Sequence, residues 1–167
     1  MPLVDWAPQL QRMIDLRNTL GLRSPIHSLA RILNPLGARV GLQSIFHPGY
    51  QAVHREASQL LGDHAIVIKG EGGEIEVNPD GICHLYGTEN GENWDEEWPA
   101  LSAQRHVKPE SLDPQQLLAF WRGELDDSYG KLAVLSSMAL ALRALGHDRD
   151  AAFAEARQRW DARHQSI

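Results

Sequence analysis

Four basic side chains recur at short spacing near the start of the sequence, and their types suit the binding of an anion. They are Arg17, Arg23, His27 and Arg31. His27 and Arg31 are four residues apart, so they would share one face of a helix. Guanidinium groups donate paired hydrogen bonds to carboxylates and phosphates. A basic row of this kind is also typical of a solvated helix face, and the spacing leaves both interpretations open.

A second candidate group is acidic and lies in the glycine-rich residues 69–79. Glu71, Glu74 and Glu76 supply its carboxylates. Glu74 and Glu76 would share a face if this segment were a strand, because alternate strand residues point the same way. The alternative is an acidic hairpin in contact with solvent.

The basic row needs an elbow of two helices to hold it. Gly21 can adopt the positive φ that ends a helix. Ser24 and Pro25 are a typical helix start, with serine as the cap and proline in the first position. We therefore expect one helix to run from near Asp5 to Gly21, and a second over residues 25–33. Isoleucine and leucine occupy the side opposite the cations, at positions 26, 29, 32 and 33.

A strand, a helix and a strand follow the elbow. Residues 40–46 and 65–68 are short apolar runs that indicate buried strands. Between them, His47-Pro48 predicts a helix start and Gly62 a helix end. This order predicts a βαβ unit with parallel strands. The expected apolar side of its helix consists of Tyr50, Val53, Ala57, Leu60 and Leu61.

The second half of the chain predicts a hairpin, a loop and three helices. Asn78-Pro-Asp-Gly81 is a turn signature, so strands are expected over residues 74–77 and 82–86. Residues 87–112 are acidic with little periodicity, which we interpret as a mobile loop. Helices are then expected from Asp113-Pro114 to about Arg122, from Asp126 or Ser128 to Leu145, and from Asp148 to about Arg163.

The charge and composition of the chain exclude some classes of function and leave others open. The net charge is −6, but residues 1–70 carry seven Lys and Arg against four Asp and Glu, a local excess of +3. An acidic total argues against a surface that coats nucleic acid, but it permits a local basic groove. No apolar run is long enough to span a membrane. The single cysteine, Cys83, fits a reducing cytoplasm and is expected to be a buried, inert thiol.

The order of these motifs resembles the second half of the anthranilate phosphoribosyltransferase family. The resemblance rests on Arg17-x-x-Leu-Gly-x-Arg23, then Asn34-Pro35, then His47-Pro48, and on residues 69–79 and the closing helices. It implies an α/β fold with a mostly parallel sheet, flanking helices and an antiparallel hairpin. Residues 1–167 would form a single C-terminal domain of the phosphoribosyltransferase type, without the family's N-terminal helical domain and first strands.

The resemblance also implies roles for individual residues. Arg17 aligns with the family arginine that helps to hold the aromatic acid substrate. The family's Asp-Glu metal pair falls on Ile75 and Glu76, so one Mg²⁺ ligand is replaced, and Glu71 or Glu74 could compensate. The family's glycine loop for phosphoribosyl pyrophosphate has no counterpart in this sequence. The chain alone is therefore expected to be inactive in phosphoribosyl transfer.

His27 and Arg31 stand where the biosynthetic enzymes carry asparagine and proline, and they resemble a divergent branch of the family that is associated with nucleic-acid binding. Arg17, Arg23, His27 and Arg31 would then contact phosphates without reading bases. A third interpretation is a module that serves only assembly. Uncovered sheet edges and apolar helix faces would favour self-association, for example as a dimer.

Overall fold

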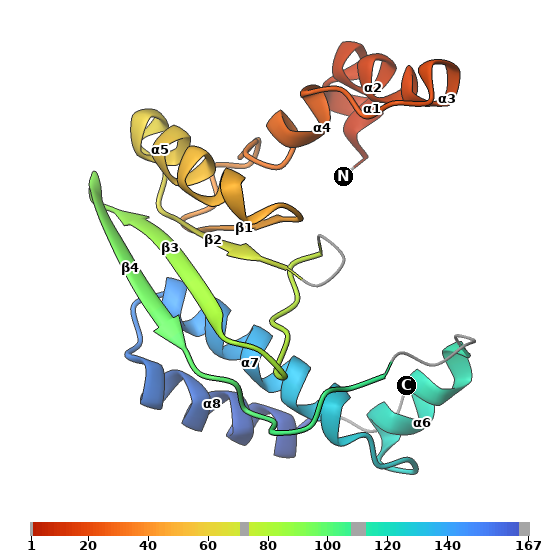
Figure 1. Ribbon diagram of the computed structural model, residues 1–167, viewed down its shortest axis with the longest axis vertical. Helices are drawn as coiled ribbons and strands as arrows, with labels where there is room; N and C mark the ends of the chain where they lie inside the picture. Colours follow the sequence, from red (N-terminus) through yellow and green to blue (C-terminus); the bar gives the residue numbers. More distant parts are fainter. Residues whose placement is uncertain (1, 71–73, 108–112, 164–167) are drawn as a thin grey trace.

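The computed structural model describes residues 2–70, 74–107 and 113–163 of the chain (Figure 1). Within these ranges one four-stranded sheet has the order β1-β2-β3-β4. Its strands are β1 (Gly41–Ile45), β2 (Ala65–Lys69), β3 (Cys83–Glu89) and β4 (Glu92–Trp98). β1 and β2 are parallel, whereas β2–β3 and β3–β4 are antiparallel. The α/β class is confirmed, but the sheet is mixed rather than mostly parallel.

The predicted βαβ unit is present. One turn of 3-10 helix (η1, Pro48–Tyr50) follows β1 and leads into α5 (Gln51–Leu61). Gly62 ends α5 with φ +72°. β2 then returns beside β1, with Ala65 opposite Gly41. The proline and the glycine therefore begin and end this helical segment as the sequence indicates.

The hairpin lies further along the chain than predicted. Residues 74–82 contain no strand, and β4 occupies part of the expected loop over residues 87–112. The turn between β3 and β4 is Asn90-Gly91, and both residues have positive φ, 52° and 82°. This conformation suits a two-residue turn, because its twist matches that of the paired strands. The prediction was wrong because we gave weight to the Asn78–Gly81 turn and overlooked Asn-Gly.

Three capped helices complete the described chain. They are α6 (Pro114–Arg122), α7 (Ser128–Ala144) and α8 (Arg149–Asp161). As predicted, the side chains of Asp113 and Asp148 accept hydrogen bonds from backbone N–H groups at the starts of α6 and α8. Asp127 caps α7, between the two start residues that we expected.

The core lies between the sheet and the pair α7–α8, while α5 covers the opposite face (Figure 1). Ile66, Ile68 and Leu85 are fully buried, as is Leu140 on α7. Burial of each such side chain stabilises the fold by about 1.5–3 kcal/mol. Cys83 belongs to this core, which confirms the expected buried thiol.

α5 buries polar side chains and exposes apolar ones, the reverse of the prediction. Its buried residues are Gln51, His54 and Ser58. Three residues of the expected apolar side, Val53, Leu60 and Leu61, are 55%, 88% and 66% exposed. Buried polar groups are stable only with hydrogen-bond partners, and these groups have partners on β1 and β3.

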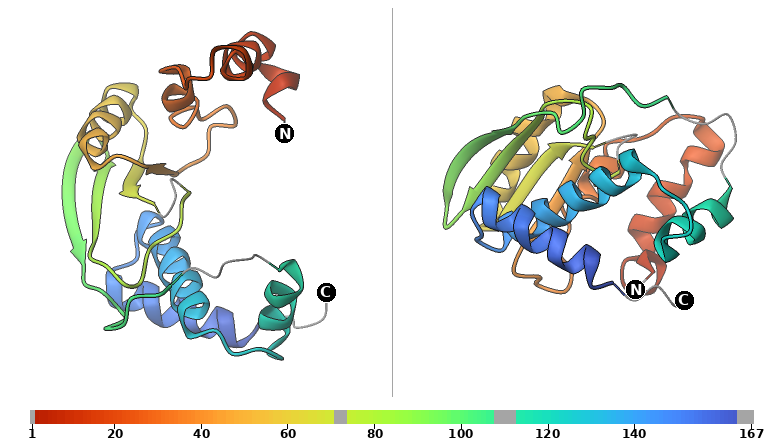
Figure 2. Two further views of the ribbon diagram at one scale, coloured as in Figure 1. Left: turned by 45° about the vertical axis from the view of Figure 1, so that its right-hand side comes forward. Right: turned by 90° about the horizontal axis from the view of Figure 1, so that it is seen from below.

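The N-terminal helices stand beside the sheet rather than on it (Figure 2). The expected first helix is divided into three, and the second is a single turn. They are α1 (Leu3–Trp6), α2 (Pro8–Asp15), α3 (Arg17–Leu20) and α4 (Ile26–Leu29). Gly21 ends α3 with φ +69°, as predicted. No helix in the described part of the chain is long and apolar enough to cross a membrane.

Candidate functional site

α4 is a single helical turn, and one of its side chains reaches back to a residue before its start. Nδ1 of His27 lies 3.2 Å from the backbone nitrogen of Ser24, so the imidazole can accept the hydrogen bond of that N–H. Such a contact resembles the backward-reaching half of a capping box. The predicted cap is wrong by one residue, since Pro25 rather than Ser24 is the N-cap and no side-chain cap hydrogen bond is made. The expected continuation to Leu33 is absent, because turns replace the helix before Pro35.

Three of the four predicted basic residues line one cleft, which we call the α4–α5 cleft. Its volume is about 650 Å³, within the range of roughly 300–1,000 Å³ for small-molecule sites. One wall consists of residues from the α4 segment: Arg23, Ser24, Pro25, His27, Ser28, Leu29, Arg31 and Ile32. The other wall consists of residues at the end of β1 and the start of α5: Ile45, Phe46, His47, Tyr50, Val53 and His54.

The predicted basic residues differ in how they are held. Arg31 donates a hydrogen bond of 2.7 Å from Nη1 to the backbone oxygen of Ser44 on β1, so it ties the α4 segment to the sheet. Arg23 and His27 line the same cleft from the start of that segment. Arg17 is exposed at the beginning of α3 and is not among the lining residues. Leu29 and Ile32 also line the cleft, so the expected apolar side is not separate from the basic one.

Aromatic side chains form part of the opposite wall, and the sequence reasoning did not single them out. Phe46 and Tyr50 are each 55% exposed, a large fraction for side chains of this size. The rings of Phe46 and His47 meet edge to face at 4.9 Å. An aromatic surface opposite arginines can contact the flat face of a ring while the cations contact its charged substituent.

His54 is the buried polar residue of this wall. Only 3% of it is exposed, and its Nδ1 lies 3.1 Å from Oε1 of Gln43. Nε2 of Gln43 in turn donates to Oγ of Ser58 over 2.8 Å. Burial, and secondarily the positive charge of Arg31, lowers the pKa of His54. His54 is therefore neutral at pH 7.

The sequence carried a signal for this group, although we did not use it. Gln51, His54 and Ser58 are spaced three and four residues apart, which places them on one face of α5. A polar stripe between two apolar strands can be an outer surface or a buried network. Periodicity alone does not distinguish the two, because it does not say which face meets the sheet.

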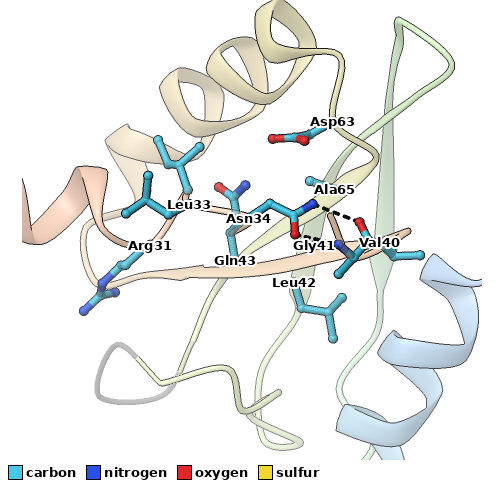
Figure 3. Close-up of a pocket in the computed structure, with 11 residues that line it drawn as sticks. Arg31, Leu33, Asn34, Val40, Gly41, Leu42, Gln43, Asp63 and Ala65 are labelled. Carbon is cyan, nitrogen blue, oxygen red and sulfur yellow. Dashed lines mark hydrogen bonds between the residues drawn. The ribbon is translucent and has the colours of Figure 1, made fainter. Parts of the chain in front are cut away.

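A smaller hollow of about 210 Å³ lies along β1 (Figure 3). Gln43 lines it, so this residue connects the hollow to His54 in the α4–α5 cleft. Asn34 braces the adjoining turn with two hydrogen bonds to the backbone of Ala38, of 2.9 and 2.7 Å. This bracing holds the chain that joins α4 to β1.

The predicted magnesium ligands are not brought together on a strand. Glu74 is exposed and Glu76 is half-buried in an irregular segment, so strand alternation does not place them on a shared face. Glu71 lies outside the described residues. Among the described residues, no group of three or more His, Cys, Asp or Glu side chains is arranged to hold a metal ion.

No protein-family model matches the chain. The chain is 31% identical over 126 residues to the anthranilate phosphoribosyltransferase of Paracidovorax citrulli, which covers 70% of this chain and 36% of that protein. It is 28% identical over 146 residues to the anthranilate phosphoribosyltransferase of Albidiferax ferrireducens. This match covers 82% of this chain and 41% of that protein.

The fold has a counterpart among solved structures. The anthranilate phosphoribosyltransferase of Saccharomyces cerevisiae, solved in complex with 4-fluoroanthranilate, matches with a TM-score of 0.70 at 15% identity. The match covers 93% of this chain and 49% of that one. The chain thus spans less than half the length of each of these three proteins.

Proposed function

Because this chain is a partial anthranilate phosphoribosyltransferase-like protein, we propose that it binds an anionic ligand in the α4–α5 cleft and does not transfer a phosphoribosyl group on its own. One observation carries the proposal. Arg23, His27 and Arg31, a basic row whose spacing fits either an anion site or a solvated helix face, line a single cleft of ligand size. A phosphate or carboxylate there would gain charge-assisted hydrogen bonds.

Binding of small anions tests this proposal. Titration of the ¹⁵N-labelled chain with benzoate and with adenosine 5′-monophosphate should shift backbone signals of the α4 segment. Arg23→Ala should weaken the affinity roughly tenfold, because it removes one charge-assisted contact worth about 1.5 kcal/mol. Arg157→Ala is the matched control, since Arg157 is exposed on α8, away from the cleft. Equal affinity of the two variants, or no shifts at all, would refute the proposed site.

The absence of transferase activity is tested separately. The chain is incubated with Mg²⁺, phosphoribosyl pyrophosphate and 2-aminobenzoate, and release of pyrophosphate is followed. We expect no release above the rate without protein. Turnover by the purified chain would overturn this part of the proposal.

A second candidate function is binding of single-stranded nucleic acid. The exposure of Phe46 and Tyr50 in the cleft that Arg23 also lines favours it, because such grooves combine cations for the backbone with aromatic rings for base stacking. Binding of labelled single-stranded DNA should then weaken about tenfold or more between 50 and 200 mM salt. Salt-insensitive binding, or binding that Arg23→Ala leaves intact, would exclude the cleft as a phosphate-contact site.

We also propose that the chain self-associates with a second copy of itself. Large apolar side chains are exposed both on the N-terminal helices, where Leu20 and Leu22 are 63% and 74% exposed, and on α5. Exposed apolar area of this kind favours association. Sedimentation velocity across a hundredfold range of concentration should show a species heavier than 18.7 kDa. A monomer at all concentrations would contradict it.

A further inference from the structure

The end of α6 carries an exposed turn over residues 123–126, which we call the α6 turn. Gly123 leaves the helix with φ +79°. The backbone N–H groups of Glu124 and Leu125 then both donate to the oxygen of Ala119, over 2.9 and 3.3 Å. These hydrogen bonds fold the turn back onto the end of the helix, so its shape is set before any partner binds.

The α6 turn presents two carboxylates on either side of one apolar side chain. Glu124 and Asp126 are exposed, and Leu125 between them is 42% exposed. Neither carboxylate has an ion-pair partner among the described residues. α6 itself has no buried residue. The turn is therefore available for contact with a surface that combines cations and apolar groups.

The α4–α5 cleft has this complementary character. Arg23 and His27 line it, and none of its lining residues in the described chain is acidic. Arg23 is exposed and forms no ion pair within the described residues. Phe46 and Val53, each 55% exposed, add apolar surface. The cleft thus suits a segment that carries carboxylates beside an apolar side chain.

The two surfaces lie on different parts of the molecule. Figure 1 shows α6 at the end of the molecule opposite to α4 and α5. The α6 turn of one chain is therefore not placed to enter the cleft of the same chain, whereas the turn of a second copy can. Each copy then keeps one cleft and one turn unused, so the contact joins copies head to tail rather than about a two-fold axis.

We propose that the α4–α5 cleft of one copy binds the α6 turn of a second copy. Glu124 and Asp126 contact Arg23 across this interface, and Leu125 contacts the apolar wall around Phe46. This inference rests on the self-association proposed above and names the two surfaces that produce it. The anion in the cleft is then a carboxylate of the second copy.

Two variants test the contact, because each alters one surface and leaves the other intact. Arg23→Glu reverses the charge of the cleft, whereas Glu124→Gln combined with Asp126→Asn neutralises the turn. We expect each to self-associate roughly tenfold or more weakly than the wild type, because charge-assisted contacts are lost. Arg157→Glu and Glu92→Gln are matched controls, since both residues are exposed and belong to neither surface. Circular dichroism checks the folding of every variant.

An equimolar mixture of the two variants tests the head-to-tail arrangement. The Arg23→Glu chain supplies an intact turn, and the Glu124→Gln/Asp126→Asn chain supplies an intact cleft. Sedimentation velocity of the mixture should therefore show a dimer of about twice the monomer mass of 18.7 kDa. This dimer should not grow further with concentration, because its remaining cleft and turn are both altered. A mixture without dimer, at concentrations where the wild type associates, would overturn the head-to-tail contact.

The wild-type chain distinguishes this inference from the proposal on which it rests. Wild-type association that both variants retain in full would overturn the contact between cleft and turn, and would leave self-association itself intact. A wild-type chain that stays monomeric at all concentrations would instead overturn the proposed self-association.

Discussion

His54 shows how a single residue can couple the stability of the fold to pH. Its pKa lies below the ordinary histidine value of 6.5, mainly because it is buried and secondarily because Arg31 is near. The unfolded chain therefore takes up a proton at this position at a higher pH than the folded chain does. The contribution of neutral His54 to the free energy of unfolding is therefore complete above pH 6.5. It is lost as the pH falls through the lowered pKa of the folded state.

We predict that the free energy of unfolding falls more steeply between pH 7 and pH 5 in the wild-type chain than in His54→Gln. Urea unfolding at several pH values measures both. The other seven histidines are common to the two proteins, so the difference in slope isolates His54. Identical slopes would mean that His54 titrates normally in the folded chain.

Cys83 illustrates the opposite effect of burial on an acid. Burial raises the pKa of its thiol to about 11. At pH 8 roughly one molecule in a thousand would carry the reactive thiolate. We predict that 5,5′-dithiobis(2-nitrobenzoate) modifies Cys83 only as fast as the protein unfolds. The measurement is the absorbance of the released thiolate in native buffer and in urea, and rapid reaction in native buffer would contradict the expected burial.

At the scale of single elements, the β3–β4 turn depends on two residues with positive φ. Gly91 has φ +82°, a conformation that costs an alanine about 1 kcal/mol or more. We predict that Gly91→Ala lowers the free energy of unfolding by about that amount. Gly49→Ala is the matched control, because a Cβ at Gly49 meets nothing within 4 Å and its φ is not positive.

Both variants are compared by urea unfolding, and the same dependence of the unfolding free energy on urea concentration is fitted to each. A Gly91→Ala protein as stable as Gly49→Ala would show that the turn relaxes to another type. The exposed position of Gly91 makes lost packing an insufficient explanation for any difference, so the comparison reports on backbone conformation alone.

The hairpin is joined to the rest of the molecule by contacts between distant parts of the chain. Arg143 on α7 bonds through Nε to Glu96 over 2.7 Å, and its guanidinium carbon lies 4.4 Å from the centre of the Trp94 ring. Trp94 in turn covers Gly87, where an added Cβ would lie 1.9 Å from the indole. These contacts fix β3 and β4 against the helical layer.

At the scale of the whole molecule, the hydrophobic core predicts a large loss of stability for one substitution. Leu140 on α7 is fully buried among side chains of the sheet and α8, so Leu140→Ala should cost about 2–5 kcal/mol through lost burial and a residual cavity. Leu117→Ala on α6 is the control, because Leu117 is 71% exposed. Thermal and urea unfolding measure both. An equal loss of unfolding free energy in the two variants would contradict the assignment of Leu140 to the core.

Local signals in the sequence predicted much of this fold. Asp113 and Asp148 cap the helices they precede, Gly21 and Gly62 end helices, and the apolar runs around Gly41 and Ala65 form parallel strands. Caps and turns depend on side chains within a few residues, so the sequence suffices for them. Asn90-Gly91 was equally local, and overlooking it displaced the predicted hairpin.

The sequence by itself determined the α/β class, most helix ends and the basic row of Arg23, His27 and Arg31. Only the tertiary structure decided that this row lines a cleft, that Arg31 is anchored to β1, and that α5 turns its polar side inward to place His54 there. The physical reason is that a buried polar side chain is stable only with specific partners. Those partners, such as Gln43, come from another element, and neither spacing nor periodicity on α5 reveals them.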